Sequence, residues 1–183
     1  MYFEETRLRF FDENDFDRIL SCLRSKNDDF YLMTCLLLYE CAARLSEAVQ
    51  VRFSDYNTTY GELTLPVTKR REEVVCKKIK ISQELVNLMA KHKKTLRLGK
   101  NDFILVRKKG NKPLFRHLFI VHMQKVVLEA LGENHYHKAN ASSIRHSKAI
   151  HMLRKEKGKN IQEVKKILGH KSVLNTTVYL QYI

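Results

Sequence analysis

The sequence lacks any CxxC pair. Its four cysteines are scattered singly along the chain, at Cys22, Cys35, Cys41 and Cys76. Cysteines without a paired spacing are expected to pack as small apolar side chains rather than to form disulfides or a metal site. The histidines His135 and His137 are close together, but no second cluster of ligands stands at a suitable distance from them along the chain. We therefore expect neither a metal nor another cofactor.

Long apolar runs are also missing. No segment approaches the length of a transmembrane helix, and the first residues do not resemble a signal peptide. There is no internal repeat and no low-complexity segment. These absences predict an intracellular protein that is not embedded in a membrane. The length of 183 residues suits one domain, which is large enough to bury a substantial core.

Basic residues are abundant, and they are unevenly distributed. Residues 1–66 hold 7 Lys and Arg against 12 Asp and Glu, a net charge of −5, whereas residues 67–183 hold 27 against 8, a net charge of +19. Any one basic run is adequately explained as a solvated surface. An excess confined to one part of the chain instead favours a polyanionic partner held along one face, with binding that depends on salt.

The hydrophobic pattern of the first half predicts two helices and a β-hairpin. Asp12 or Asn14 is expected to cap the first helix, which ends near residues 26–28, and the second, nearly all apolar, covers residues 30–41. Residues 61–69 and 74–81 alternate apolar and polar side chains around a turn at residues 70–73, as strands of a hairpin do.

The second half is predicted to be mainly helical. A helix starts after Ser82 and dissolves into the basic run that ends at Gly99. Residues 103–106 are expected to form a short strand, residues 114–131 a long helix, and residues 132–140 a polar loop. Further on, Asn160 is typical of a helix N-cap and Gly169 of a helix end.

Three short signatures near the C-terminus occur in a fixed order. Arg145 and His146 open an otherwise small and apolar helix, His170 follows Leu-Gly at a helix end, and Tyr179 follows a Thr-Thr pair on what should be a short final helix. In this order the segment resembles the second conserved box of the tyrosine recombinases, the phage-integrase family.

Two earlier segments extend the resemblance to about residues 10–183. Residues 41–49 resemble the family's first box, with Arg44 as the first active-site arginine and Glu47 beside it. The hairpin matches the position of the family's catalytic lysine, for which we choose Lys69. Lys77 and Lys78 remain competitors, because the register of this lysine-rich hairpin cannot be fixed from one sequence. Three spaced signatures together are far more specific than any one of them.

The resemblance implies an α+β, mainly helical catalytic domain with a small antiparallel sheet. It also implies a single catalytic domain over residues 1–183, without the N-terminal clamp domain that the family usually carries. The implied activity is site-specific recombination of double-stranded DNA, by a homo-oligomer, expected to be a tetramer on two duplexes.

The family chemistry assigns a role to each of five residues and requires neither metal nor ATP. Arg44 and Arg145 would bind the non-bridging oxygens of the phosphate, and His170 would donate a further hydrogen bond. Lys69 would give a proton to the leaving oxygen, provided that neighbouring positive charge lowers its pKa. Tyr179 would attack and become joined to the 3′-phosphate, which conserves the bond energy for rejoining.

One position departs from the family pattern. Three residues before Arg145 the family usually has histidine, sometimes lysine, and here it is Ser142. That residue ordinarily assists proton handling, and His146 is not at the missing position. Two other functions stay open: relaxation of DNA by a type IB topoisomerase-like reaction, which uses the same chemistry on one duplex, and a DNA-binding module with weakened catalysis, for which Ser142 is the best argument.

Each predicted site residue also has an ordinary structural explanation. Arg44 would simply pair with Glu47, His170 would satisfy carbonyls at a helix end, and Tyr179 would be a core aromatic with Tyr182 as the exposed tyrosine. Only the joint occurrence of these residues, in family order and spacing, favours the recombinase interpretation.

Overall fold

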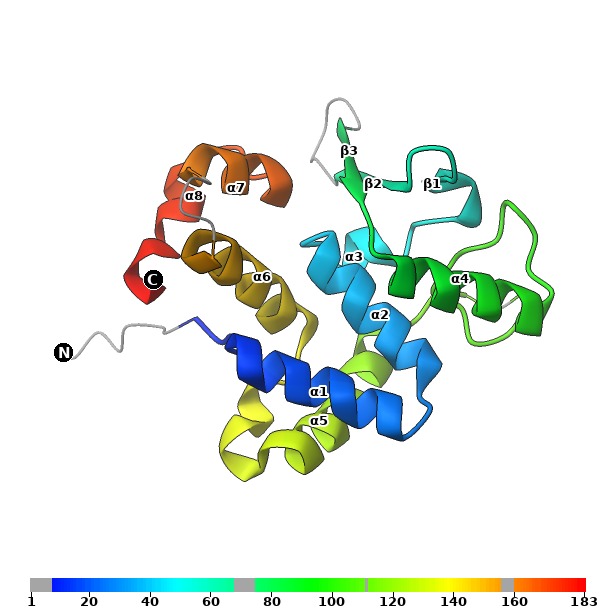
Figure 1. Ribbon diagram of the computed structural model, residues 1–183, viewed down its shortest axis with the longest axis horizontal. Coiled ribbons are helices and arrows are strands. Elements are labelled where there is room, and N and C mark those ends of the chain that lie inside the picture. The colour runs from blue at the N-terminus through cyan, green and yellow to red at the C-terminus, as the bar shows by residue number, and fades with distance from the viewer. Residues whose placement is uncertain (1–7, 68–74, 111, 156–159) are drawn as a thin grey trace.

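The computed structural model describes residues 8–67, 75–110, 112–155 and 160–183. Figure 1 shows helix α2 in the middle of the molecule, with α1 and α5 below it, α6 on one side, and α4 with the β-sheet on the other. Helices α1 and α5 pack together, and α2 contacts both α4 and α6. The predicted class, mainly helical with a small antiparallel sheet, is confirmed.

The first two helices form where their caps and apolar faces predict them. Helix α1 covers Glu13–Ser25, with the Asp12 carboxylate accepting from the Asp15 backbone N–H at 2.8 Å. Helix α2 covers Asp29–Glu40 and is buried on most of its circumference, as an all-apolar helix must be. The two helices supply a large part of the main core.

A short helix, a 3₁₀ turn and three strands follow. Helix α3 covers Leu45–Ala48, η1 covers Phe53–Asp55, and strand β1 covers Tyr56–Asn57. The predicted hairpin is confirmed as β2, Glu62–Val67, antiparallel to β3, Val75–Lys80. Strand β1, which the sequence did not predict, pairs with the outer edge of β2 and makes the sheet three-stranded in the order β1-β2-β3.

The segment after the hairpin differs from the prediction in two places. Helix α4, Gln83–Leu96, continues through the lysine run, because lysine is a good helix former. The helix ends at Arg97, whose φ of 52° is left-handed. The strand predicted at residues 103–106 is wrong. Among the residues that the structure describes, that segment makes an isolated antiparallel bridge, Phe103 with Arg52, instead of a ladder.

The remaining helices carry the C-terminal signatures. Helix α5 covers Arg116–Leu131, and the predicted polar loop after it is largely the 3₁₀ helix η2, Glu133–Lys138. Helix α6, Ala141–Lys155, starts four residues before Arg145 rather than at it. Helix α7, Ile161–Leu168, has the predicted Asn160 cap and ends at Gly169, whose φ is 67°. Helix α8 covers Leu174–Thr177 and η3 covers Leu180–Tyr182, so Tyr179 lies between two short helices.

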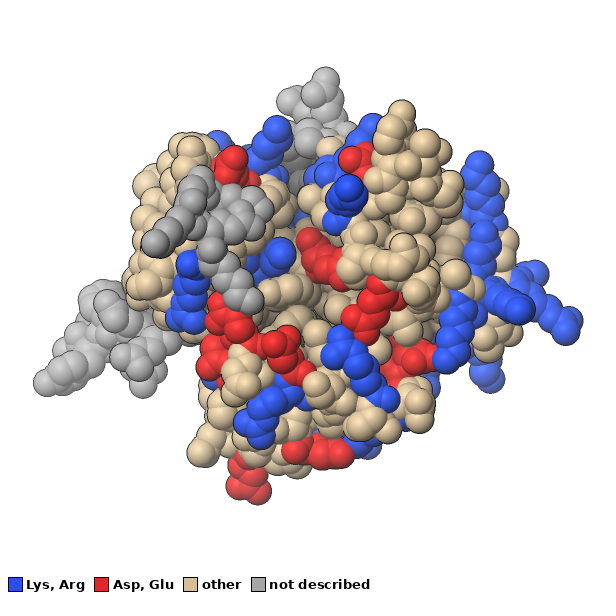
Figure 2. Space-filling view, viewed as in Figure 1, with Lys and Arg blue, Asp and Glu red and all other residues tan. Residues whose placement is uncertain are grey.

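The buried side chains form two clusters. The larger contains α1, α2, α4, α5 and the inner face of β2, whereas the smaller lies between α6, α7 and the C-terminal segment and contains Ala42 and Tyr179. On the face drawn in Figure 2, Lys and Arg gather at the right, over the side where α4 lies, and Asp and Glu are scattered across the middle and lower part, where α1 and α2 lie. Charge is thus unevenly spread in space as well as in sequence.

Candidate active site

Arg44 is held at the turn between α2 and α3. The turn requires a residue in the left-handed backbone conformation, and Ala42 takes this conformation with a φ of 43°. Arg44 then caps α3, where its backbone N–H donates to the Glu47 carboxylate at 3.0 Å and its Nη1 donates to the other carboxylate oxygen at 2.7 Å. The predicted ion pair therefore exists, yet the Arg44 side chain remains 46% exposed. Part of its guanidinium is free to meet a ligand.

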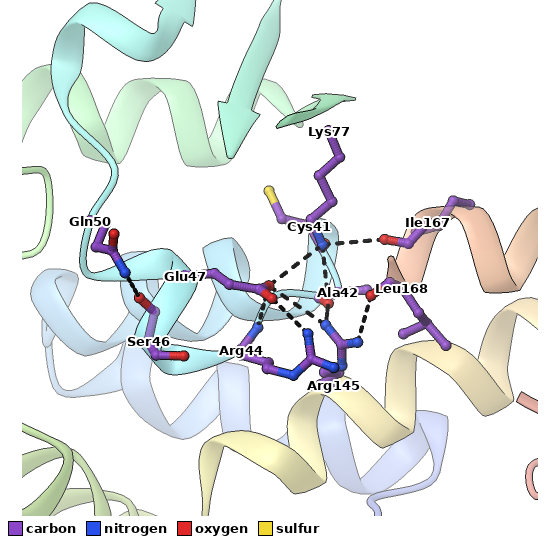
Figure 3. A network of polar contacts seen from close by, with 10 residues as sticks. All are labelled: Cys41, Ala42, Arg44, Ser46, Glu47, Gln50, Lys77, Arg145, Ile167 and Leu168. Atoms are coloured by element: carbon purple, nitrogen blue, oxygen red, sulfur yellow. Dashed lines mark hydrogen bonds and ion pairs between the residues drawn. The ribbon is translucent and has the colours of Figure 1, made fainter. Parts of the chain in front are cut away.

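Glu47 is the centre of a buried polar network (Figure 3). Its side chain is fully buried, and its carboxylate lies 2.7 Å from Arg44 Nη1, 3.7 Å from Arg145 Nη1 and 4.0 Å from Lys77 Nζ. One carboxylate thus holds three cations close together. A buried charge is tolerated only when it is paired in this way, and the surplus positive charge favours an anion at the same place.

Arg145 projects from α6 toward the same turn. Its Nη1 donates to the Ala42 carbonyl at 2.6 Å and its Nη2 to the Leu168 carbonyl at 2.6 Å, so the guanidinium ties the end of α2 to the end of α7. Only 4% of the residue is exposed. Burial, with a further contribution from Arg44, lowers the pKa of Arg145 to about 10, which leaves it fully charged at neutral pH.

Of the three candidate lysines, the structure describes two. Lys77 Nζ donates to the carbonyls of Cys41 at 2.6 Å, Ala42 at 3.3 Å and Ile167 at 3.2 Å, and burial lowers the pKa of Lys77 to about 8. Lys78, next on the strand, is exposed on the opposite face. Lys69 lies outside the described residues.

His170 stands directly after the end of α7, as predicted. Its Nδ1 lies 2.9 Å from the hydroxyl of Thr176, a buried residue of α8. The explanation of His170 as a partner of helix carbonyls holds only for its backbone, whose N–H donates to Lys165 at 3.1 Å. The side chain is instead oriented by Thr176, and its ring lies nearly parallel to the ring of Tyr179, at 13° and 6.4 Å between centroids.

Tyr179 is 2% exposed and belongs to the smaller core cluster. Its hydroxyl nevertheless has a hydrogen-bond partner, because His146 Nδ1 of α6 lies 2.9 Å from it. Tyr182, expected to be the exposed tyrosine, is half-buried, and its hydroxyl accepts from the Leu8 N–H at 2.8 Å. The expectation for Tyr182 is therefore wrong, because its hydroxyl links the last 3₁₀ helix to the segment before α1.

Several of these polar side chains line one cavity. It has a volume of about 440 Å³, and among the residues that line it are Arg44, Arg145, His146, His170 and Tyr179. Ser142 lines it as well, exposed on the first turn of α6. Four of the five residues singled out in the sequence thus share one space, although they lie up to 135 positions apart along the chain.

The electrostatics of the cavity keep its histidines neutral. Burial and the charge of Arg145 lower the pKa of both His146 and His170 to about 4. Burial raises the pKa of Tyr179, although Arg145 and Arg44 oppose this rise. At neutral pH the cavity therefore offers the guanidiniums of Arg44 and Arg145, two neutral imidazoles and a protonated phenol. Such a set can bind a tetrahedral oxyanion beside a hydroxyl.

Sequence reasoning missed one residue that lines this cavity and one that orients a lining side chain. Arg116, exposed at the start of α5, also lines it, and no local pattern distinguishes this arginine from other surface arginines. Thr176 orients His170, and a signal for it existed in the Thr-Thr pair before Tyr179. Among the residues that the structure describes, no group of His, Cys, Asp or Glu could hold a metal ion. In the same ranges, no helix is long and apolar enough to cross a membrane.

Similar proteins of known family are readily found. A protein of Methanocaldococcus jannaschii named "Probable integrase/recombinase protein" is 30% identical over 78% of this chain and 43% of its own length. Tyrosine recombinase XerD of Corynebacterium glutamicum is 27% identical over 78% of this chain and 45% of its own length. The chain thus spans slightly less than half the length of these relatives.

Solved structures share the fold. The XerH site-specific recombinase bound to palindromic difH substrate has a TM-score of 0.78 at 18% identity, covering 96% of this chain and 50% of that one. The catalytic domain of bacteriophage HP1 integrase has a TM-score of 0.62 at 24% identity, covering 96% of this chain and 89% of that one. The family model matches residues 9–182, nearly the whole sequence. The chain belongs to the phage integrase family.

Proposed function

We propose that this protein is a site-specific DNA recombinase that cleaves and rejoins DNA through a 3′-phosphotyrosyl intermediate. The observation that carries the proposal is the cavity of about 440 Å³ in which Arg44, Arg145, His170 and Tyr179 meet. Two guanidiniums, an imidazole and a phenol are the groups needed to neutralise a phosphodiester while an oxygen attacks it. Membership of the phage integrase family supports the same reaction.

The two arginines have different tasks in this proposal. Arg145 is buried and tied to two carbonyls, so its position is fixed before DNA binds, and it supplies preorganised charge. Arg44 is half-exposed and has guanidinium nitrogens left for a phosphate oxygen. Glu47 pairs with both arginines and holds their guanidiniums close together. Its single negative charge leaves the site with surplus positive charge.

The leaving 5′-oxygen needs a proton. Lys69 remains our choice for the donor, as the hairpin position predicts. Lys77 is the alternative: its lowered pKa of about 8 suits proton transfer, but its ammonium is engaged by three carbonyls. A 5′-bridging phosphorothiolate, whose thiolate leaves without a proton, distinguishes them. It should restore cleavage to the alanine variant of the true donor.

Double-stranded DNA is the proposed substrate, and a tetramer on two duplexes is the proposed assembly. The net charge of +19 over residues 67–183 supplies the attraction to phosphate. A relative in structure, the XerH recombinase, is bound to difH substrate in its crystal. We also propose that residues 1–183 act as one catalytic domain.

The test is the capture of a covalent protein–DNA adduct. The probe is a pool of nicked duplexes with a randomised centre, so that no target sequence needs to be known beforehand. Adducts that survive denaturation are digested, and mass spectrometry identifies the DNA-linked peptide. We expect the peptide to contain Tyr179 and the adduct to vanish in Tyr179→Phe. Tyr182→Phe is the matched control, because it also removes a hydrogen-bonded tyrosine hydroxyl.

Three outcomes would redirect the proposal. No adduct, together with intact DNA binding, would indicate a binding module. An adduct on Tyr182 would show that Tyr182, and not Tyr179, is the nucleophile. An adduct on Tyr179 with relaxation of supercoiled DNA but no joining between duplexes would indicate a topoisomerase-like enzyme.

A further inference from the structure

The phenol of Tyr179 must lose its proton if it is to attack phosphorus. Among the described residues, the hydrogen-bond partner of its Oη is His146 Nδ1, at 2.9 Å. The two rings are 5.7 Å apart between centroids and inclined by 46°, so His146 presents its edge rather than its face to the hydroxyl. In the tautomer that carries its hydrogen on Nε2, the Nδ1 lone pair is directed at the hydroxyl hydrogen.

The other groups around the phenol are poorly suited to accept this proton. Arg44, Arg145 and Arg116, from three different elements, are donors only. His170 uses its Nδ1 on Thr176 and makes a stacked rather than an edge contact with Tyr179. The Glu47 carboxylate is directed at Arg44 and Arg145.

The protonation state of His146 suits a base. Its pKa of about 4, lowered by burial and by Arg145, leaves the imidazole neutral at pH 7. The phenol, whose pKa is raised by burial, still carries its proton. A bound phosphodiester would add negative charge next to Arg145, offset the effect of this arginine on the imidazole, and raise the pKa of His146 toward a value useful for proton transfer.

We propose that His146 is the general base that accepts the Tyr179 proton during cleavage and returns it during rejoining; this rests on the proposed recombinase function. In the forward step the Oη–H proton moves to His146 Nδ1, the Oη–P bond forms and the P–O5′ bond breaks. The leaving oxygen takes its proton from the acid of the proposed function, Lys69 or Lys77. In reverse, the imidazolium gives its proton back to Oη. Ser142, a hydroxyl on the rim of the cavity, has no titration near neutral pH with which to do this.

The test compares single-turnover cleavage by the full chain and by His146→Asn across pH 5–9, on a duplex recovered from the wild-type adducts. We expect about a 100-fold slower cleavage at pH 7, the size typical of a lost general base. The wild-type rate should level off above the pKa of His146 in the complex, whereas the variant rate should keep rising with hydroxide. His151→Asn is the matched control, since His151 is a second α6 histidine bonded to a tyrosine, with its Nδ1 2.8 Å from Tyr39 Oη.

A 5′-bridging phosphorothiolate duplex separates a base from an acid. If His146 acts on the phenol, the variant stays about 100-fold slow on this substrate, because only the leaving group has changed. Restored cleavage would instead make His146 an acid toward the leaving oxygen and overturn the inference, as would a variant whose rate and pH profile match those of the wild type. A wild type that forms no adduct would reject the proposed function itself, and this inference with it.

Discussion

Lys77 offers a quantitative test of the buried network, because its side chain is 8% exposed and its neighbour Lys78 is exposed on the same strand. Burial lowers the pKa of Lys77 from 10.5 to about 8. The folded protein therefore releases this proton near pH 8, whereas the unfolded chain keeps it to about pH 10.4. Replacing Lys77 by methionine removes this difference.

The sign follows from proton counting. Between pH 8 and 10.4 the unfolded chain binds more protons at this site than the folded protein, so Lys77 makes the free energy of unfolding rise with pH across that window. With each pH unit worth about 1.4 kcal/mol, the lowering from 10.5 to about 8 corresponds to a rise of about 3 kcal/mol. Cys41, whose pKa burial raises to about 12, stays protonated in the folded protein over the same range.

The assay is urea denaturation at intervals from pH 7 to pH 10.5. We expect the free energy of unfolding of the wild type, minus that of Lys77→Met, to increase by about 3 kcal/mol over this range. Lost hydrogen bonds to the carbonyls of Cys41, Ala42 and Ile167 shift the variant curve at every pH but do not change this slope. The free energy of unfolding of Lys78→Met, plotted against pH, should run parallel to that of the wild type. A Lys77→Met curve that also runs parallel would show that the ammonium is not desolvated, and the network as described would be wrong.

Three further outcomes are expected. Arg145→Lys should cleave at least about 100-fold more slowly, because an ammonium cannot keep both carbonyl contacts and a phosphate, while DNA binding changes little in a mobility-shift assay. Thr176→Val should slow cleavage about tenfold in the single-turnover assay, because the His170 ring loses its orienting bond. On acidification from about pH 6.5 to pH 4, the free energy of unfolding should fall, because the unfolded chain protonates histidines that the fold keeps neutral to about pH 4. His146→Asn should make this decline shallower, and an unchanged decline in thermal melts would contradict the burial of that ring.

Local order in this protein follows closely from local sequence. Helix α7 begins and ends where Asn160 and Gly169 predict, because a cap and a left-handed end are made by residues within one turn of each other. The hairpin follows from its alternation of side chains, whereas the strand predicted at residues 103–106 failed because a strand needs a neighbour that no local pattern reveals.

The order and spacing of the motifs around Arg44, Arg145, His170 and Tyr179 were sufficient to predict the family, and these four residues line one cavity. Only the tertiary packing decided that Arg145 and Lys77 would join Arg44 at Glu47, that Lys77 would be buried rather than Lys78, and that His146 would meet the phenol of Tyr179. These contacts join residues that are 30 or more positions apart or that lie on different elements. Their distances are therefore set by how helices pack, and a one-residue change in strand register would have exchanged the two lysines.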